Sequence, residues 1–232
     1  MTPGYAAVHL EAVASTQDEA RARFAKTPIL VTARRQDAGR GRFGRVWESA
    51  PRAVAASIAF RPSWESAAWG RISLVGGLAA ANLIETAGGP PISLKWPNDL
   101  IDRHGRKLGG LLGEIEGGSV VIGLGINLFW PDPPAGIGAV LELDPGVEVP
   151  IRMAEQWADN LFERLAVPPA AWGREEYTGR CSLLGEEVRW EPDQTGIAID
   201  IGPDGELVVD QGGSRRSLLS GEVRTLRIVE GT

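Results

Sequence analysis

The sequence predicts an α+β protein, in which helices cover a mixed, largely antiparallel sheet and a small barrel follows at the C-terminal end. Three observations support this fold class. Apolar residues recur at helical spacing in two segments, residues 72–83 and 150–165. Between them, strand-like runs over residues 92–128 are joined by short turns, which is typical of an antiparallel meander. From about residue 183 the strands become short and closely spaced, as in a small barrel.

The N-terminal part is expected to place a helix between an apolar opening and a buried strand. Residues 9–13 are the opening, and Ser15 or Thr16 then caps a helix that carries acids in its first turn. A buried strand follows over residues 29–34, and another runs over residues 54–60 after an arginine-rich segment.

The central part is expected to be a helix followed by the meander. The run Gly88-Gly89-Pro90-Pro91 should end the helix, because glycine and proline terminate helices. Residues 92–96 alternate as a strand, and residues 102–106 form the turn of a hairpin, with His104 exposed on it. Strands normally avoid glycine, so glycines within the meander indicate close approach of a ligand or another backbone. These glycines are Gly109, Gly110, Gly123 and Gly125.

The C-terminal part begins with a proline- and glycine-rich loop over residues 129–138, a candidate lid or boundary loop. Pro150 opens an amphipathic helix, and a short helix is expected over residues 168–177. Barrel strands are expected over residues 187–190, 196–201, 206–209, 217–219 and 223–228. We therefore predict two domains, residues 1–180 and residues 181–232.

Composition narrows the functional class. The net charge of −6 argues against a nucleic-acid partner, which would need a broad basic face. A single cysteine, Cys181, excludes a disulfide framework and favours the cytoplasm, and we expect it in the core rather than as a nucleophile. Residues 1–10 have neither the basic nor the apolar region of a signal peptide, and we expect no run that approaches the length of a membrane span.

The arginine loop, residues 34–47, is a cationic segment in this acidic chain. It holds Arg34, Arg35, Arg40, Arg42 and Arg45 together with Gly39, Gly41 and Gly44. Glycine allows the backbone to approach a ligand closely, and arginine offers a planar fork that matches carboxylate or phosphate oxygens. The composition therefore predicts a loop that closes over a polyanion. With three glycines and mutually repelling charges, we expect it to be disordered when empty.

The sequence excludes two common nucleotide-binding motifs, the dinucleotide-binding motif and the P-loop. Gly39-x-Gly41-x-x-Gly44 fits the dinucleotide pattern, but a strand-like run over residues 54–60 follows where a helix should open. The chain also contains no Gly-x4-Gly-Lys-Ser/Thr sequence, which excludes a P-loop.

The loop motif Gly39-Arg40-Gly41-Arg42-Phe43-Gly44-Arg45-x-Trp47 resembles the adenylate-binding loop of biotin protein ligases, which attach biotin to carboxylase carrier domains. Three further segments match that family in the same order: Lys95-Trp96-Pro97-Asn98-Asp99-Leu100, Lys107-Leu108-Gly109-Gly110 and Gly123-Leu124-Gly125-Ile126-Asn127. The resemblance implies the short form without an N-terminal DNA-binding domain. It also implies an SH3-like C-terminal domain, with Ser220-Gly221-Glu222-Val223 near its end.

The resemblance assigns expected roles to particular residues. Lys95 and Arg42 are the candidate catalytic residues. Biotin is expected to contact Ser15, Thr16, Gln17, Gln36, Gly39, Arg40, Gly41, Arg42, Lys95, Gly123 and Gly125. ATP or the adenylate is expected to contact Arg40, Arg42, Trp47, Lys107 and Asn127. Mg²⁺ should arrive with ATP rather than occupy a protein metal site. Gln17 stands where the family has asparagine, and residues 52–55 replace a glycine- and aromatic-containing run.

The implied function is ATP-dependent formation of biotinyl-5'-AMP and transfer of biotin to a lysine of a biotin carboxyl carrier domain. The expected partners are therefore biotin, ATP and that carrier, with no nucleic acid and no membrane, and a homodimer is possible. Two alternatives stay open. One is a lipoate or octanoate ligase of the same superfamily, and the other is a biotin- or nucleotide-binding protein without turnover.

Overall fold

The computed structural model describes residues 4–190, 193–219 and 224–225. A seven-stranded sheet forms the larger part, with strand order β1-β2-β3-β7-β6-β5-β4. Only β1 and β2 are parallel, and every other neighbouring pair in this sheet is antiparallel. Its strands are β1 (Ala6–Val13), β2 (Ile29–Gln36), β3 (Arg52–Phe60), β4 (Ser93–Lys95), β5 (Asp99–Ile101), β6 (Lys107–Glu116) and β7 (Ser119–Phe129). The mixed, largely antiparallel sheet predicted from the sequence is confirmed.

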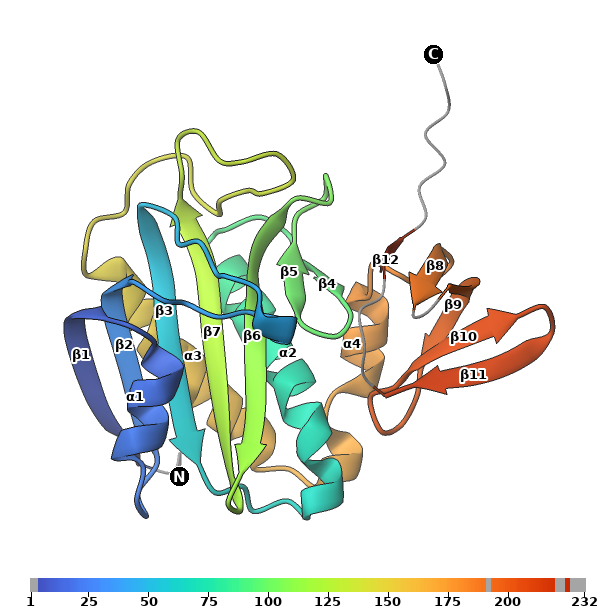
Figure 1. Ribbon diagram of the computed structural model, residues 1–232, viewed down its shortest axis with the longest axis horizontal. Coiled ribbons are helices and arrows are strands. Elements are labelled where there is room, and N and C mark those ends of the chain that lie inside the picture. Colours follow the sequence, from blue (N-terminus) through green and yellow to red (C-terminus); the bar gives the residue numbers. More distant parts are fainter. Residues whose placement is uncertain (1–3, 191–192, 220–223, 226–232) are drawn as a thin grey trace.

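Helices cover both faces of this sheet (Figure 1). Helices α2 (Ile72–Thr86) and α3 (Val149–Leu165) pack on one face, and α1 (Thr16–Arg23) lies on the opposite face. The amphipathic pattern of α3 explains why it packs on the sheet, because Met153, Trp157 and Leu161 all point into the core. The arginine loop crosses the sheet on the α1 face, so that face carries the functional site.

Helix α2 is apolar on nearly every side. Together with the 3₁₀ turn before it, Ser66–Thr86 is a stretch of 21 residues that is long and apolar enough to span a membrane. The expectation that no run approaches the length of a membrane span was therefore wrong. This stretch is mostly buried within the protein, against the sheet and α3, so its apolar surface is explained by the core it fills.

The C-terminal part forms a second, five-stranded antiparallel sheet with strand order β11-β10-β9-β8-β12. Its strands are β8 (Glu187–Trp190), β9 (Gln194–Ile201), β10 (Leu207–Gln211), β11 (Ser214–Leu218) and β12 (Arg224–Thr225). This sheet fits the expected SH3-like domain. The motif at residues 220–223 and most of the last expected strand lie outside the described residues.

The short helix expected over residues 168–177 is divided. A 3₁₀ turn covers Pro169–Ala171, and α4 begins only at Arg174 and ends at Arg180. The cause is Gly173, which has φ of 98° and so breaks the helical path between the two pieces.

One hydrophobic core runs through both sheets. Val188, Ala198 and Ile201 of the second sheet belong to the same buried cluster as Leu74 of α2 and Trp96, which follows β4. Removing residues 181–232 would uncover part of this core. The boundary at residue 180 therefore remains a prediction about domains, and a truncated chain is a poor test of function.

Candidate functional site

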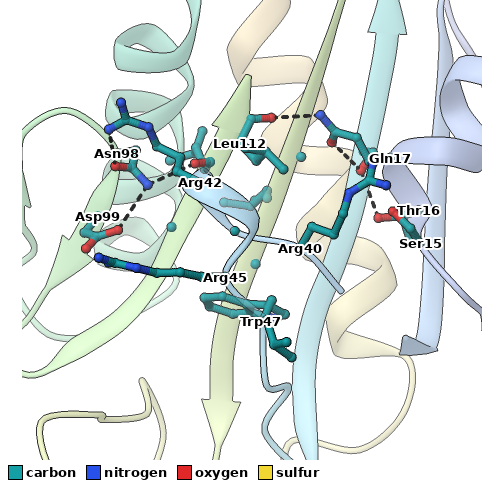
Figure 2. Close-up of a pocket in the computed structure, with 18 of the residues that line it drawn as sticks. Ser15, Thr16, Gln17, Arg40, Arg42, Arg45, Trp47, Asn98, Asp99 and Leu112 are labelled. Carbon is teal, nitrogen blue, oxygen red and sulfur yellow. Dashed lines mark hydrogen bonds between the residues drawn. The ribbon is translucent and has the colours of Figure 1, made fainter. Parts of the chain in front are cut away.

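A cavity of about 210 Å³ lies on the α1 face of the large sheet, beneath the arginine loop (Figure 2). Strands β3, β6 and β7 form its floor, while α1, the loop and the β4–β5 turn form its walls. Ligand pockets for compact organic molecules usually measure ~300–1,000 Å³. The cavity is therefore smaller than a typical ligand pocket in this structure.

At one end of the cavity, polar groups from α1, β2 and β3 converge. Ser15 is the N-cap of α1, and its side chain accepts a hydrogen bond from the backbone of Asp18. The Thr16 hydroxyl lies 3.0 Å from Gln36 Oε1 and 2.8 Å from Ser57 Oγ. Thr16 is 3% exposed, so this end offers buried, preordered hydrogen-bonding groups.

Gln17 extends from α1 across the sheet and is held entirely by the protein. Its Nε2 lies 3.1 Å from Leu112 O, 3.3 Å from Val121 O and 3.2 Å from Glu114 Oε2, so both amide hydrogens are engaged. Its Oε1 accepts from Ser57 Oγ at 3.2 Å. In this arrangement Gln17 shapes the wall of the cavity, and its N–H groups are not offered to a ligand.

The opposite end of the cavity is cationic. The whole cavity is lined by a single carboxylate, Asp99, and by five basic side chains: Arg40 beside the polar end, and Arg42, Arg45, Lys95 and Lys107. Lys107 Nζ lies 2.7 Å from Asp99 Oδ1, and Arg42 Nη1 lies 3.3 Å from Asn98 Oδ1. Within the described residues, Lys95 forms no side-chain hydrogen bond or ion pair. An excess of cations in a partly enclosed site favours a polyanionic ligand.

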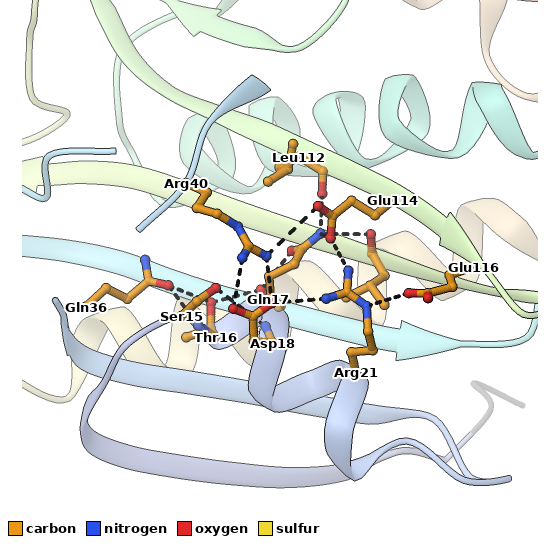
Figure 3. Close-up of polar contacts among 12 residues, drawn as sticks. Ser15, Thr16, Gln17, Asp18, Arg21, Gln36, Arg40, Leu112, Glu114 and Glu116 are labelled. Carbon is orange, nitrogen blue, oxygen red and sulfur yellow. Dashed lines mark hydrogen bonds and ion pairs between the residues drawn. The ribbon is translucent and has the colours of Figure 1, made fainter. Parts of the chain in front are cut away.

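An ion pair at Arg40, between Gly39 and Gly41, holds the arginine loop against α1. Arg40 donates from Nη1 and Nη2 to the two oxygens of Asp18, at 2.9 and 2.6 Å (Figure 3). Asp18 also pairs with Arg21, which in turn pairs with Glu114 and Glu116. Hydrogen bonding to Asp18 raises the pKa of Arg40. The pair holds the loop against α1 in this structure, and the disorder expected of the loop without ligand remains a prediction.

Only part of the loop needs the conformational freedom of glycine. Gly41 has φ of −108°, which any residue adopts. Positive φ occurs instead at Phe43 and Gly44, at 57° and 70°. A large apolar residue at positive φ costs conformational energy, so the loop's tip is a strained turn. Phe43 is 65% exposed and points its ring outward from the core.

Trp47 anchors the C-terminal end of the loop on β7. A Cβ at Gly125 would lie 2.6 Å from the Trp47 ring, so the indole rests directly on this glycine. Lys107 Nζ lies 5.7 Å from the centre of the ring. The glycine in β7 thus permits a close approach, as the sequence predicted for this strand, and the approaching group is an indole.

Two expected site residues do not line the cavity. Gly39 lies at the base of the loop, where its carbonyl accepts from Trp47 N at 2.9 Å. Asn127 is 2% exposed and donates to Gly138 O at 3.2 Å, while its Oδ1 is buried without a partner among the described residues. The remaining expected residues meet at the cavity: Ser15, Thr16, Gln17, Gln36, Arg40, Gly41, Arg42, Trp47, Lys95, Lys107, Gly123 and Gly125.

Other reactive side chains lie away from the site. His104 is exposed on its turn, as expected, and His9 contacts Thr32 on the β1–β2 edge. Cys181 is buried, and burial raises the pKa of its thiol, which keeps it protonated and unreactive at neutral pH. Within the described residues no group of three or more His, Cys, Asp or Glu could hold a metal ion.

Three residues that hold the site in place were not among the site residues expected from the sequence: Asp18, Ser57 and Asp99. Asp18 is visible as a first-turn acid of α1, but its contact with Arg40 is formed only by the fold. Ser57 joins Thr16 to Gln17, and Asp99 holds Lys107. Asp99 lay inside a matched motif and could have been included on that ground.

Comparison with known proteins agrees with the fold and the site. The model of the Biotin/lipoate A/B protein ligase family matches residues 10–127. The chain belongs to this family. A biotin--[acetyl-CoA-carboxylase] ligase from Mycobacterium tuberculosis is 34% identical over 214 residues, which cover 86% of this chain and 79% of that protein. A ligase of the same description from Paracoccus denitrificans is 28% identical, covering 83% and 88%.

Solved structures show the same architecture. The biotin protein ligase from Aquifex aeolicus, in complex with biotin and ATP, superposes with a TM-score of 0.78 at 25% identity. The match covers 96% of this chain and 99% of that one, and so includes the second sheet.

Proposed function

We propose that the chain is an ATP-dependent biotin protein ligase that forms biotinyl-5'-AMP and transfers biotin to a lysine of a biotin carboxyl carrier domain. The observation that carries this proposal is the polarity of the cavity. A buried set of hydrogen-bonding groups at Thr16 suits a neutral, polar ring, and a cationic end at Lys95 suits a carboxylate and phosphates.

The first reaction joins two anions. A biotin carboxylate oxygen attacks the α-phosphorus of ATP, a bond forms between them, and the bond to the β-phosphate breaks to release pyrophosphate. At an effective dielectric near 20, two unit charges ~4 Å apart repel by ~4 kcal/mol. Arg42 and Lys95 would offset this repulsion, and Lys95 would stabilise the charge that develops at phosphorus.

The second reaction transfers the acyl group. The amine of the carrier lysine attacks the acyl carbon of biotinyl-5'-AMP, the bond to the phosphate oxygen breaks, AMP leaves, and the amine gives up a proton. The cations at the cavity stabilise the leaving phosphate in this step as well.

The nucleotide would lie between the loop and β7. Trp47 presents an indole for the adenine, a contact worth ~1–3 kcal/mol for a stacked base. Lys107 would contact the phosphates. Asn127, two residues beyond Gly125 on β7, would contact the nucleotide through its side chain, whose buried Oδ1 has no partner among the described residues. Mg²⁺ would arrive on the phosphates, which fits a cavity with Asp99 as its one lining carboxylate, since Mg²⁺ sites on nucleotides use few protein ligands.

Further properties belong to the same proposal. The partner is the carrier domain of a biotin-dependent carboxylase, the compartment is the cytoplasm, and a homodimer is allowed.

The experiment that tests the proposed function is incubation of the protein with ATP, Mg²⁺, biotin and a carrier domain, followed by streptavidin detection of the carrier. Labelling should need both ATP and biotin. Labelling with lipoate in preference to biotin would identify a lipoate ligase, and ligand binding without labelling would identify a sensor.

A further inference from the structure

Lys95 lies in a weakly supported position. It ends β4, a strand of three residues at the edge of the large sheet, which pairs within that sheet only with β5. No side-chain hydrogen bond or ion pair of Lys95 is formed within residues 4–190, 193–219 and 224–225. The position of its ammonium group therefore depends on the backbone that carries it.

The residues on either side of Lys95 are attached to the C-terminal part of the chain. The carbonyl of Leu94 accepts a hydrogen bond from Ser182 N at 2.9 Å. Trp96 is 2% exposed, and its Nε1 donates to the carbonyl of Gly205 at 2.9 Å. The segment before β8 and the turn between β9 and β10 thus contact the residues on either side of the proposed catalytic lysine.

The turn at residues 202–206, which accepts the hydrogen bond from Trp96, is held in place by its own contacts. Gly205 has φ of 83°, and a Cβ there would lie 2.5 Å from Leu74 Cδ1, so only glycine fits without adjustment. The carbonyl of Pro203 accepts from Trp172 Nε1 at 2.9 Å and from Arg71 Nη1 at 3.2 Å. Contacts from α2 and from the segment before α4 therefore hold the turn in one position.

We propose that the turn at residues 202–206 positions Lys95 for adenylation by holding the indole of Trp96. Trp96 and Gly205 are positioning residues, since the proposed effect of both reaches the reaction through Lys95, although Trp96 also forms part of the cavity wall. This inference rests on the proposed function. A misplacement of a reacting group by about 1 Å can reduce the rate ~100-fold, so a fixed edge strand matters to the reaction.

The test compares two substitutions that remove the same group. Trp96→Phe removes the indole N–H that binds Gly205. Trp157→Phe is the matched control, because its Nε1 donates to Gly76 O at 3.0 Å and its side chain is fully buried between α3 and α2. Both variants lose one buried hydrogen bond to a carbonyl. The measured quantities are kcat and KM for biotin in biotin-dependent exchange of pyrophosphate into ATP, together with the midpoint of thermal unfolding.

We expect Trp96→Phe to lower kcat ~10-fold with KM for biotin within ~2-fold, and Trp157→Phe to leave kcat within ~2-fold at a similar loss of thermal midpoint. Gly205→Ala changes the turn that accepts the hydrogen bond from Trp96, and it should reproduce the kcat loss. In a Lys95→Ala background, Trp96→Phe should cause no further loss, because coupled residues are not additive. Equal kcat losses in the two tryptophan variants, or full additivity with Lys95→Ala, would overturn the inference. Absence of biotin-dependent exchange in the wild-type protein would instead refute the proposed function.

Discussion

Arg40 and Asp18 form a bidentate ion pair that joins the arginine loop to the first turn of α1, with N–O distances of 2.9 and 2.6 Å. The pair turns the Arg40 guanidinium toward Gln17 and Thr16 rather than toward the cationic end of the cavity (Figure 2). In this structure, Arg40 therefore lies at the end of the cavity that neutral polar groups line. Asp18 is the residue that holds it there.

Asp18→Asn should release the loop in the empty protein. An amide in place of the carboxylate weakens a charge-assisted pair, which is the stronger kind of hydrogen bond. We expect tryptic cleavage between Arg34 and Arg45 to become several-fold faster without ligand, because trypsin cuts arginines in mobile loops. Asp200→Asn is the control, since it removes an Arg–Asp pair of 2.7 Å on the second sheet. Equal cleavage rates in wild type and Asp18→Asn would show that the pair does not hold the loop. Biotin with ATP should restore protection.

Lys95→Ala should remove most of the adenylation activity while the protein stays folded. The lysine lies half-buried in the cavity wall, and loss of one preorganised contact to developing charge costs ~10²–10³ in rate. Pyrophosphate exchange measures the rate, and circular dichroism checks the fold. The matched control is Lys26→Ala, an exposed lysine after α1. Near wild-type exchange by a folded Lys95→Ala protein would remove Lys95 from the mechanism.

Asp144 should titrate near pH 2. Hydrogen bonds from Arg52 and from the backbone of Gly146 lower the pKa of this carboxyl to about 2. A carboxyl whose folded pKa is lowered adds stability above its unfolded pKa of ~3.9, and that stability is lost as the pH falls through the folded value. The difference in unfolding midpoint between wild type and Asp144→Asn should therefore be present at pH 5 and vanish toward pH 2. Carboxyl carbon NMR checks the cause, because Arg52→Gln should return the pKa of Asp144 toward ~3.9. An unchanged titration in that variant would exclude Arg52 as the cause.

The sequence predicted those features that depend on neighbouring residues. The hairpin at residues 102–106, the N-cap at Ser15 and the amphipathic face of α3 follow from local pattern, and the structure contains all three. The expected site residues meet at one cavity largely because they lie in short motifs at strand ends and loops. Local chemistry specifies such segments, and the sheet brings them together.

Features that depend on distant contacts could not be predicted in this way. The groups that accept hydrogen bonds from the Gln17 amide nitrogen lie 95 to 104 residues away in sequence, so local sequence does not predict its contacts with Leu112 and Val121. The same holds for the parallel pairing of β1 with β2 and for the single core shared by the two sheets. Gly173 is a different case. The glycine itself could have been read from the sequence as a helix break. Its positive φ, and the position of Leu78 Cδ1 at 2.9 Å from where a Cβ would lie, depend on the packed fold.

Gly123 provides the space that Gln17 fills, and this relation can be tested by rescue. A Cβ at Gly123 would lie 2.4 Å from Gln17 Oε1, so Gly123→Ala must displace the Gln17 amide. We expect KM for biotin to rise ~10-fold, because the polar wall beside Thr16 loses its shape, while kcat changes less. The measurement is the dependence of pyrophosphate exchange on biotin concentration.

The rescue uses the shorter amide. Gln17→Asn removes one methylene, so combining it with Gly123→Ala withdraws the amide from the new methyl group and relieves the overlap. The double variant should bind biotin better than Gly123→Ala alone, with a coupling opposite in sign to the single effects, as expected for residues in direct contact. Gln17→Asn by itself should weaken biotin binding, because the shorter side chain cannot reach both Leu112 O and Val121 O. Strictly additive effects of the two substitutions would show that Gly123 does not act through Gln17.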